Sequence, residues 1–555
     1  TLVKPMLPST LALAALAPAA PHPAQDPVAV VLDGDFVPAV GFVERIDFVR
    51  VTDTGSWIVE VDTDNTPTTE DGAVLTDAGV LYREGEFLSA PAGSALGGFD
   101  SLALARDGSI STNFFLDGLF PGVDSGVFVD GTLRIQEGDA ANDPALSPGT
   151  TFLGFFDVKR NASGVTHLLA TIDDPNIPST LEQALFIDDG SGTFRARLVE
   201  GDVLPGQTAP VVLFGSGPHQ SAVDDGLGYF FRVELNLDPT QDVALYLDDG
   251  TTFTKIAQEG DPSPVAGRAW ENFLLSEVAL ADGGHIAFSG QLDGDSASDT
   301  LIVRNGAKFV QEGDSLTAIA PFALTGFGSG PLDLARTGQL AWFGDWDDPD
   351  TSRDTGIFVD DELVVQEGVT TVGGIAVAAL SGIPDGYSLS PNGRWLIFEA
   401  RLADGRDGAF LVDLSLGAAS VGCDPPNPNS RGIVGRLSAT GSDVAGGEPL
   451  RFVAQDLPFG QFGFLVTGTQ VVNQPFAGGS QGVLCLGGML GRFDQQIVNT
   501  GAVGYAEVGV DTTAIPVNPV AAVLAGETWS FQLWHRDLNP GVTSNFTGSV
   551  SITFQ

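Results

Sequence analysis

The chain has 555 residues, of which 71 are acidic and 25 are basic, giving a formal net charge of −46. A field of that sign repels phosphate backbones and anionic lipid surfaces, which argues against nucleic acid and direct membrane binding as functions. The 71 glycines and 34 prolines lie between short apolar runs, a pattern typical of many turns and many short strands.

The first 25 residues have the pattern of a secretory signal peptide. Lys4 precedes an apolar run over residues 11–16, and small residues follow over 17–20. We therefore expect residues 1–25 to be removed and the protein to be secreted, or held at the cell surface or in the periplasm. No later stretch is apolar over the length of a transmembrane helix, so we expect no such segment in the mature chain.

A strand that ends in a Gly-acid turn recurs along the first three-quarters of the chain. Its turn glycines are Gly34, Gly85, Gly138, Gly201, Gly260, Gly313 and Gly368, so successive copies lie 51 to 63 residues apart. A regular period of this length indicates a propeller, a solenoid or another repeat array. Each interval also holds a polar-Gly turn followed by an apolar strand, as at residues 282–288 and 336–342. We read four short strands per unit, A to D, the content of one propeller blade.

The two ends of the array indicate a closed ring. The last unit, through residues 408–414, lacks a final Gly-acid strand, whereas residues 28–35 supply that strand without a preceding unit. Pairing the two would complete the last blade and remove the exposed sheet edges. We therefore predict an all-β fold, with residues 26–416 forming a seven-bladed β-propeller of about 55-residue repeats.

After residue 416 the pattern changes to a turn-rich linker and then to new alternating strands. We predict that residues 417–555 form a β-sandwich-like C-terminal domain. Cys423 and Cys485 are the two cysteines of the chain, and in an exported protein they are most simply one disulfide. Two cysteines and five scattered histidines do not have the spacing of a zinc site.

The C-terminal sequence also carries a family resemblance. Residues 526–537 (GETWSFQLWHRD), followed by Asn539-Pro540-Gly541, resemble the C-terminal β module of large secreted proteins from Planctomycetes and related bacteria. The Gly-acid repeats resemble exported repeat proteins of the same bacteria. The resemblance implies bacterial export and this architecture, and it brings no activity and no catalytic residues.

The acidic loops between strands B and C are the best metal candidates. In the propeller assignment they share one face of the disc with the Gly-acid turns. Two of these loops carry oxygens at spacings that hard cations prefer, so Ca²⁺ is the expected metal if one binds. Their aspartates are Asp293, Asp295, Asp299, Asp345, Asp347, Asp348 and Asp350. A solvated acidic surface is the alternative interpretation, and no cofactor is required by either.

No catalytic motif stands out in the sequence. The acids of the Gly-acid turns recur in six units, which favours a shared structural task in accepting backbone N–H groups, whereas a catalytic residue should be unique to one blade. No Gly-x-Ser-x-Gly elbow occurs. Among the histidines, His219 in a Ser-Gly-Pro-His-Gln loop is the one to examine for a pocket.

Two classes of function remain open. The first is an exported, non-enzymatic binding or scaffold protein whose partner is a glycan or a protein at the cell surface. The alternative is a secreted polysaccharide-active hydrolase or lyase with acidic residues at the propeller face. Carboxylates, His and Arg converging in one deep axial pocket would favour the enzyme, and a shallow, uniformly acidic face would favour binding.

Overall fold

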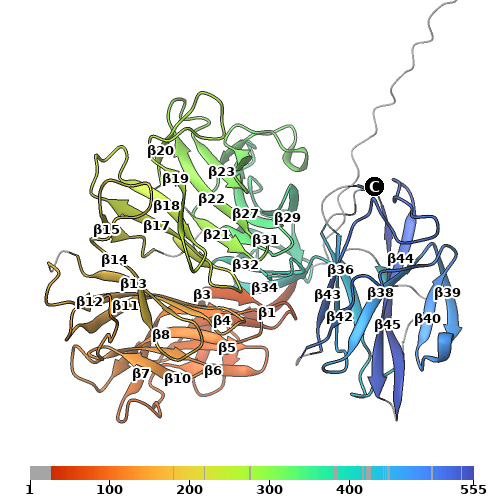
Figure 1. Cartoon of the computed structure of the whole chain (residues 1–555), viewed down its shortest axis with the longest axis horizontal. Coiled ribbons are helices and arrows are strands. Elements are labelled where there is room, and N and C mark those ends of the chain that lie inside the picture. The colour runs from red at the N-terminus through yellow and green to blue at the C-terminus, as the bar shows by residue number, and fades with distance from the viewer. Residues whose placement is uncertain are drawn as a thin grey trace, which may run out of the picture.

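The computed structural model describes residues 27–415, 418–419, 427–441, 443, 445–446, 450–501, 504–538 and 541–554, except 179–180, 218, 274–276 and 381–383. The chain is all-β, and its antiparallel sheets of four to six strands before residue 414 are consistent with a β-propeller (Figure 1). The described helices are two short 3-10 turns, η1 (Thr317–Ile319) and η3 (Ala477–Gly479). None of the described helices is long and apolar enough to cross a membrane. The predicted signal peptide lies outside the described residues.

The first four sheets follow one another along the chain and are numbered in that order. Sheet 1 contains β2 (Phe36–Val37), β3 (Gly41–Val51), β4 (Trp57–Thr63), β5 (Gly72–Thr76) and β6 (Gly79–Arg83). Sheet 2 contains β7 (Ala95–Leu104), β8 (Ile110–Asp117), β9 (Ser125–Val129) and β10 (Thr132–Gln136). Sheet 3 contains β11 (Thr151–Arg160), β12 (Thr166–Asp173), β13 (Gln183–Asp188) and β14 (Arg195–Val199). Sheet 4 contains β15 (Val211–Phe214), β16 (Ser221–Val223), β17 (Tyr229–Leu235), β18 (Val243–Asp248) and β19 (Phe253–Gln258).

Three more sheets complete this part of the chain. Sheet 5 contains β20 (Trp270–Asn272), β21 (Val278–Ala281), β22 (His285–Leu292), β23 (Thr300–Arg304) and β24 (Ala307–Gln311). Sheet 6 contains β25 (Leu324–Gly326), β26 (Asp333–Leu334), β27 (Leu340–Trp346), β28 (Thr355–Val359) and β29 (Glu362–Gln366). Sheet 7 contains β1 (Val28–Leu32), β30 (Thr371–Val372), β31 (Ile375–Leu380), β32 (Tyr387–Leu389), β33 (Trp395–Leu402) and β34 (Asp407–Asp413).

The N-terminal strand completes the last sheet, as the sequence predicts. β1 pairs antiparallel with β34, with Val28 opposite Leu411 and Leu32 opposite Gly408. In Figure 1 the red β1 accordingly lies beside the teal β34, at the end of a succession of sheets that runs from red to teal. The pairing satisfies backbone groups that would otherwise be a free sheet edge.

Apolar side chains join each sheet to the next. For example, one buried cluster contains residues of sheets 3 and 4, and another contains residues of sheets 4 and 5. Sheet 7 is joined to sheet 1 in the same way, through Ile397, Ala409, Val49 and Val59. Because a sheet with a neighbour on each face is buried on both faces, its strands do not alternate between buried and exposed residues. β9 (Ser125–Val129), for example, is buried along its whole length.

The Gly-acid turns act as strand caps. Each follows the last strand of a sheet. In four of them the glutamate accepts the N–H of the first residue of the strand next to that last strand, as Glu200 Oε2 does from Gln183 N at 3.0 Å. In four of them the aspartate after the glycine also accepts a backbone N–H, as Asp202 does from Val199 N at 3.0 Å. The glycine is required because φ is positive, +75° at Gly85, and because a Cβ there would lie 2.8 Å from the Glu70 side chain. The repeated acids are therefore structural.

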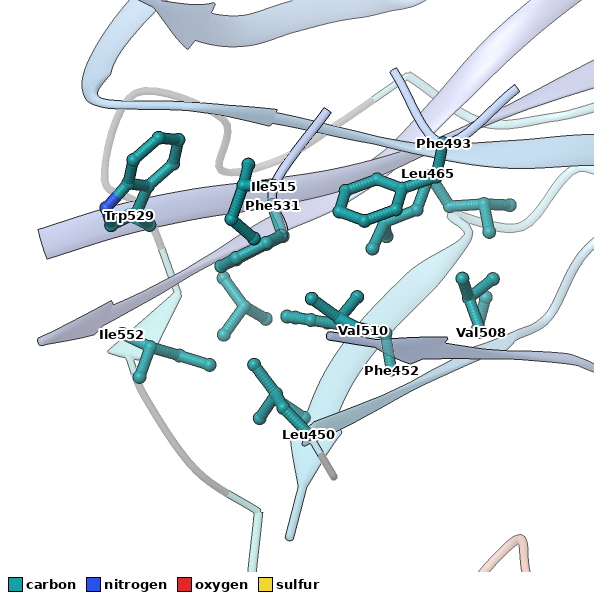
Figure 2. Close-up of a cluster of buried hydrophobic side chains, with 14 of the residues drawn as sticks. Leu450, Phe452, Leu465, Phe493, Val508, Val510, Ile515, Trp529, Phe531 and Ile552 are labelled. Carbon is teal, nitrogen blue, oxygen red and sulfur yellow. The ribbon is translucent and has the colours of Figure 1, made fainter. Parts of the chain in front are cut away.

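The C-terminal strands form three further sheets. One contains β35 (Ala418–Ala419), β38 (Phe462–Gly468), β41 (Gly491–Arg492), β42 (Val498–Asn499), β44 (Thr528–Leu538) and β45 (Val542–Thr553). The second contains β36 (Arg436–Thr440), β37 (Leu450–Gln455) and β43 (Ala506–Val510), and the third contains β39 (Gln470–Pro475) and β40 (Val483–Gly487). Figure 2 shows the core between the C-terminal sheet that contains β44 and the one that contains β37 and β43. In this core Trp529 and Phe531 face Phe452 and Val510.

The predicted disulfide stays a prediction. Cys485 is fully buried in β40, and the described residues contain no free cysteine. Its predicted partner, Cys423, lies outside the described residues.

A buried polar cluster joins the C-terminal strands to the first seven sheets. Arg336, in the polar-Gly turn of sheet 6, donates to Asp53 of sheet 1 at 2.7 Å and to Glu507 of β43 at 3.0 Å. Asp53 also accepts from Asn392 N at 2.8 Å, and the Asp53 carbonyl accepts from Gln455 Nε2 at 3.0 Å. Burial raises the pKa of Asp53 to about 6, and Arg336 opposes that shift.

Candidate functional site

The strand at one end of each sheet differs from the predicted single strand A. In sheets 4 to 7 it is split in two, for example into β15 and β16, and in sheets 1 to 3 its register shifts at β-bulges, for example between Ile46 and Phe48. A bulge or break rotates a side chain out of the regular alternation, which is why such features occur beside binding sites. The breaks bring forward an aspartate in sheets 1, 2 and 7, namely Asp47, Asp100 and Asp385, and His219 in sheet 4.

These interrupted strands surround one cavity of about 560 Å³, to which all seven sheets contribute. We call it the axial cavity. Its carboxylates are Asp47, Glu60, Asp100, Asp157, Asp333 and Asp385. Its cations are Arg50, Lys159 and Arg160, and His219 also lines it. The seven sheets therefore surround a polar centre with an aspartate from five of them, whereas the cations among its described residues come only from sheets 1 and 3.

Arg50, His219 and Asp385 form the tightest cluster in the axial cavity. Arg50 Nη2 donates to Asp385 Oδ1 at 2.5 Å, and His219 Nε2 lies 2.9 Å from the same oxygen. The three side chains are 15 to 22% exposed. The His219 backbone has a φ of +57°, in the left-handed region, and its carbonyl accepts from Val278 N at 2.8 Å.

The environment keeps Asp385 ionised. Burial alone would raise the pKa of Asp385, but the charge of Arg50 and the hydrogen bond and charge of His219 hold that pKa well below its ordinary value. The carboxylate is therefore ionised across the physiological pH range.

Glu60 of β4 has the opposite protonation state. Burial raises the pKa of its carboxyl to about 8, and the negative charges of Asp47 and Asp385 add to the shift. Among the described residues none donates a hydrogen bond to it. At neutral pH Glu60 is therefore a protonated acid in the same cavity as an ionised aspartate.

The other acids of the axial cavity already have partners. Asp157 accepts from Lys159 Nζ at 2.6 Å and from the hydroxyl of Ser221. Asp333 accepts from Ser388 Oγ and from Leu389 N, both at 2.9 Å. These carboxylates fix neighbouring strands, whereas Asp385 is held by Arg50 and His219, and Glu60 accepts no hydrogen bond from a described residue.

The predicted metal loops do not converge on one point. The Asp293 carboxylate accepts from Ala269 N at 2.9 Å, and Asp347 accepts from Ala323 N at 2.7 Å. Asp348 accepts from Asp350 N at 2.9 Å and pairs with Arg353 at 3.0 Å. The remaining candidates, Asp295, Asp299, Asp345 and Asp350, also lie in or beside these two loops. No three acidic, His or Cys side chains are grouped to hold a metal in the described part of the chain. Ca²⁺ binding stays a prediction.

The loop positions themselves agree with the sequence assignment. A Cβ at Gly313 would lie 3.5 Å from the Ala297 carbonyl oxygen, and one at Gly138 would lie 3.1 Å from that of Gly122. Each of these Gly-acid turns therefore lies against the loop between the second and third principal strands of its own sheet.

Sequence reasoning found one residue of the axial cluster and missed the others. His219 was the histidine singled out for a pocket, and it lines the axial cavity. Arg50 and Asp385 are 335 residues apart and belong to no motif, so only ring closure brings them together. Glu60 stands in an ordinary strand, and no local pattern distinguishes it.

Part of the chain matches a known family model. Residues 161–321 and 224–416 match the model of a family of unknown function (DUF7453). The matched ranges contain sheets 4, 5 and 6 in full. No curated protein matches the chain.

Several solved structures are similar at low identity. A protein of unknown function from Dyadobacter fermentans is 10% identical, with 70% of this chain and 98% of that chain covered and a TM-score of 0.27. The sialidase of Trypanosoma rangeli is 9% identical, with coverages of 96% and 92% and a TM-score of 0.28. The α-L-arabinanase of Penicillium chrysogenum is 12% identical, with coverages of 71% and 99% and a TM-score of 0.28. At these values the likenesses carry no argument about chemistry.

Proposed function

We propose that this chain is an exported hydrolase that cleaves a neutral polysaccharide in the axial cavity. In this proposal residues 26–416 form a seven-bladed β-propeller, residues 417–555 form a β-sandwich-like domain, and residues 1–25 direct export. Glu60 acts as the general acid, and Asp385 acts as the base or nucleophile.

The observation that carries the proposal is the unequal protonation of two carboxyls in one cavity. Glycoside hydrolysis ordinarily needs a protonated carboxyl to donate to the leaving oxygen and an ionised one to activate water or attack the sugar. Carboxyls whose surroundings drive their pKa values apart are the usual solution. Burial raises the pKa of Glu60 to about 8, whereas Arg50 and His219 keep Asp385 ionised.

The lining of the cavity favours a neutral saccharide. Its five aspartates outnumber the three cations, and Arg50 and Lys159 are already paired with Asp385 and Asp157. An anionic polysaccharide would meet net repulsion, which favours a hydrolase over a lyase that acts on uronic acids. Carboxylates accept hydrogen bonds from sugar hydroxyls, and the exposed ring of Phe156 offers an apolar surface for a sugar face.

The test is the release of reducing ends from a panel of neutral and anionic polysaccharides by the full-length protein. We expect cleavage of a neutral member, with a loss of at least about 100-fold in Glu60→Gln and in Asp385→Asn. Glu44→Gln is the matched control, because Glu44 is exposed on the neighbouring strand β3 and lies outside the cavity lining.

Two other results would contradict the proposal, and one of them would favour an exported, non-enzymatic binding protein. Binding of a glycan without cleavage, lost in the same two variants, would contradict the hydrolase and support an exported binding protein. Cleavage that survives both substitutions would contradict the assignment of the site.

A further inference from the structure

A second cavity lies between sheets 5 and 6. It has a volume of about 530 Å³, and apolar side chains make up much of its wall, including Ile302, Phe327 and Trp342. Leu332 lines both this cavity and the axial cavity. Well-packed interiors hold few voids of this size, whereas sites for small ligands commonly occupy about 300–1,000 Å³.

Glu277 contributes a buried carboxyl to this wall, whose other polar residues are Asn272, Ser289, Gln291, Thr300 and Glu312. Its Oε2 is buried and accepts no hydrogen bond from any described residue, while its backbone N–H donates to Ser289 Oγ at 3.0 Å. Burial raises the pKa of Glu277 to about 9, with the charge of Asp385 adding to the shift and that of Lys159 opposing it. A neutral carboxyl has an O–H to donate, and leaving the buried Oε2 without a hydrogen-bond partner is unfavourable.

Two glycines, Gly290 and Gly330, form part of the cavity wall. A Cβ at Gly290 would lie 2.8 Å from the rings of Phe273 and Trp270, and one at Gly330 would lie 2.7 Å from the ring of Tyr387. The rings packed against these glycines allow no side chain there, so the wall is fixed at both positions.

We propose that the cavity between sheets 5 and 6 is a second ligand site, for a small uncharged molecule with an apolar ring system and one hydrogen-bond acceptor. The rings pack against Ile302, Phe327 and Trp342, and Glu277 donates to the acceptor at the inner end. Gln291, which is exposed and lines the same cavity, marks the opening to solvent.

The test uses the full-length protein and the fluorophore 6-propionyl-2-dimethylaminonaphthalene, which is neutral, carries a naphthalene ring system and has a ketone acceptor. We expect one molecule to bind per chain, with the blue-shifted emission of an apolar environment. Ile302→Trp, which fills the cavity, should abolish that emission. Glu277→Leu should weaken binding about tenfold, because it removes the donor and keeps the bulk.

Two further variants keep the proposal falsifiable if Ile302→Trp does not fold. Gln291→Trp changes an exposed side chain and should block entry, whereas Glu271→Leu, at an exposed position of β20 outside the cavity lining, should leave binding unchanged. The proposal is overturned if the fluorophore does not bind, or if it binds equally well to the Glu277→Leu and Gln291→Trp proteins. Saccharide cleavage is measured separately, so neither result depends on the proposed hydrolase.

Discussion

The acids of the Gly-acid turns and the acids Glu60 and Asp385 of the axial cavity differ in their hydrogen-bond partners. Glu200 recurs in other sheets as Glu259 and Glu312, and each accepts a backbone N–H of its own sheet. Glu60 and Asp385 line the axial cavity, and Asp385 pairs with the side chains of Arg50 and His219. An acid that caps a strand of its own sheet is explained by the fold, and an acid that faces a cavity needs another explanation.

The largest effect is expected at Arg336, whose buried side chain pairs with two carboxylates, Asp53 and Glu507. Arg336→Ala would leave Asp53 and Glu507 buried without their cation, and we expect a loss of about 3–5 kcal/mol in the free energy of unfolding. The measurement is urea unfolding at pH 7. Arg401→Ala is the control, because its pair with Asp407 is exposed and should contribute less than about 1 kcal/mol. Equal losses in the two variants would contradict the importance of the buried cluster.

A pH-dependent effect is expected from Glu60. Its folded pKa of about 8 lies above the ordinary value of 4.5, so the folded state holds this proton more tightly than the unfolded state. That contribution to stability is complete at pH below the ordinary value and is lost as pH rises through 8. Glu60→Gln cannot ionise, so it should be more stable than the wild type at pH 9, by on the order of 3 kcal/mol, and nearly equal at pH 5.

The measurement is urea unfolding of wild type, Glu60→Gln and the exposed control Glu44→Gln at the two pH values. A Glu60→Gln protein that gains no stability over the wild type between pH 5 and pH 9 would contradict the buried, protonated state.

A smaller effect is expected from a repeated acid. Glu200→Gln weakens the acceptor for Gln183 N, and we expect a loss of about 1 kcal/mol in the free energy of unfolding without any change in saccharide cleavage. Thermal unfolding and the reducing-end assay on the same sample are the two measurements. Loss of cleavage with stability intact would place chemistry in the repeated turns and so reverse the comparison.

The smallest effect is expected from calcium. The carboxylates of Asp293, Asp347 and Asp348 already accept backbone N–H groups, and binding to them would have to compete with these contacts. We expect thermal unfolding in millimolar CaCl₂ to match that in NaCl at equal ionic strength, because both salts screen the acidic loops. A melting temperature that rises only with calcium would instead establish the metal predicted from the sequence.

The sequence was informative wherever a feature repeats. The missing last strand and the spare N-terminal strand together predicted the pairing of Val28 with the region of Leu411, which is confirmed. The repeated glutamates were assigned a structural task, and Glu200 performs it. Both predictions follow from period and turn chemistry, which are local properties.

The site could not be predicted in the same way. Asp385 reaches Arg50 only because the ring closes, and its position depends on a break in an innermost strand that no periodic pattern marks. His219 could be singled out as a lone histidine in a glycine-containing loop, but its carboxylate partner could not. Because the chain has 71 acidic residues, many pairs of carboxyls lie close together in the sequence by chance, and such a pair does not identify an active site.

The central claim is that Glu60 donates a proton to the leaving oxygen of a saccharide held beside ionised Asp385. The pH dependence of kcat/KM for the cleaved polysaccharide tests this claim most directly. The account predicts that kcat/KM of the wild type falls as pH rises through about 8, because Glu60 then loses its proton. Glu60→Gln should show low activity without that alkaline limb. A Glu60→Gln protein that retains wild-type kcat/KM at pH 6 would contradict the account.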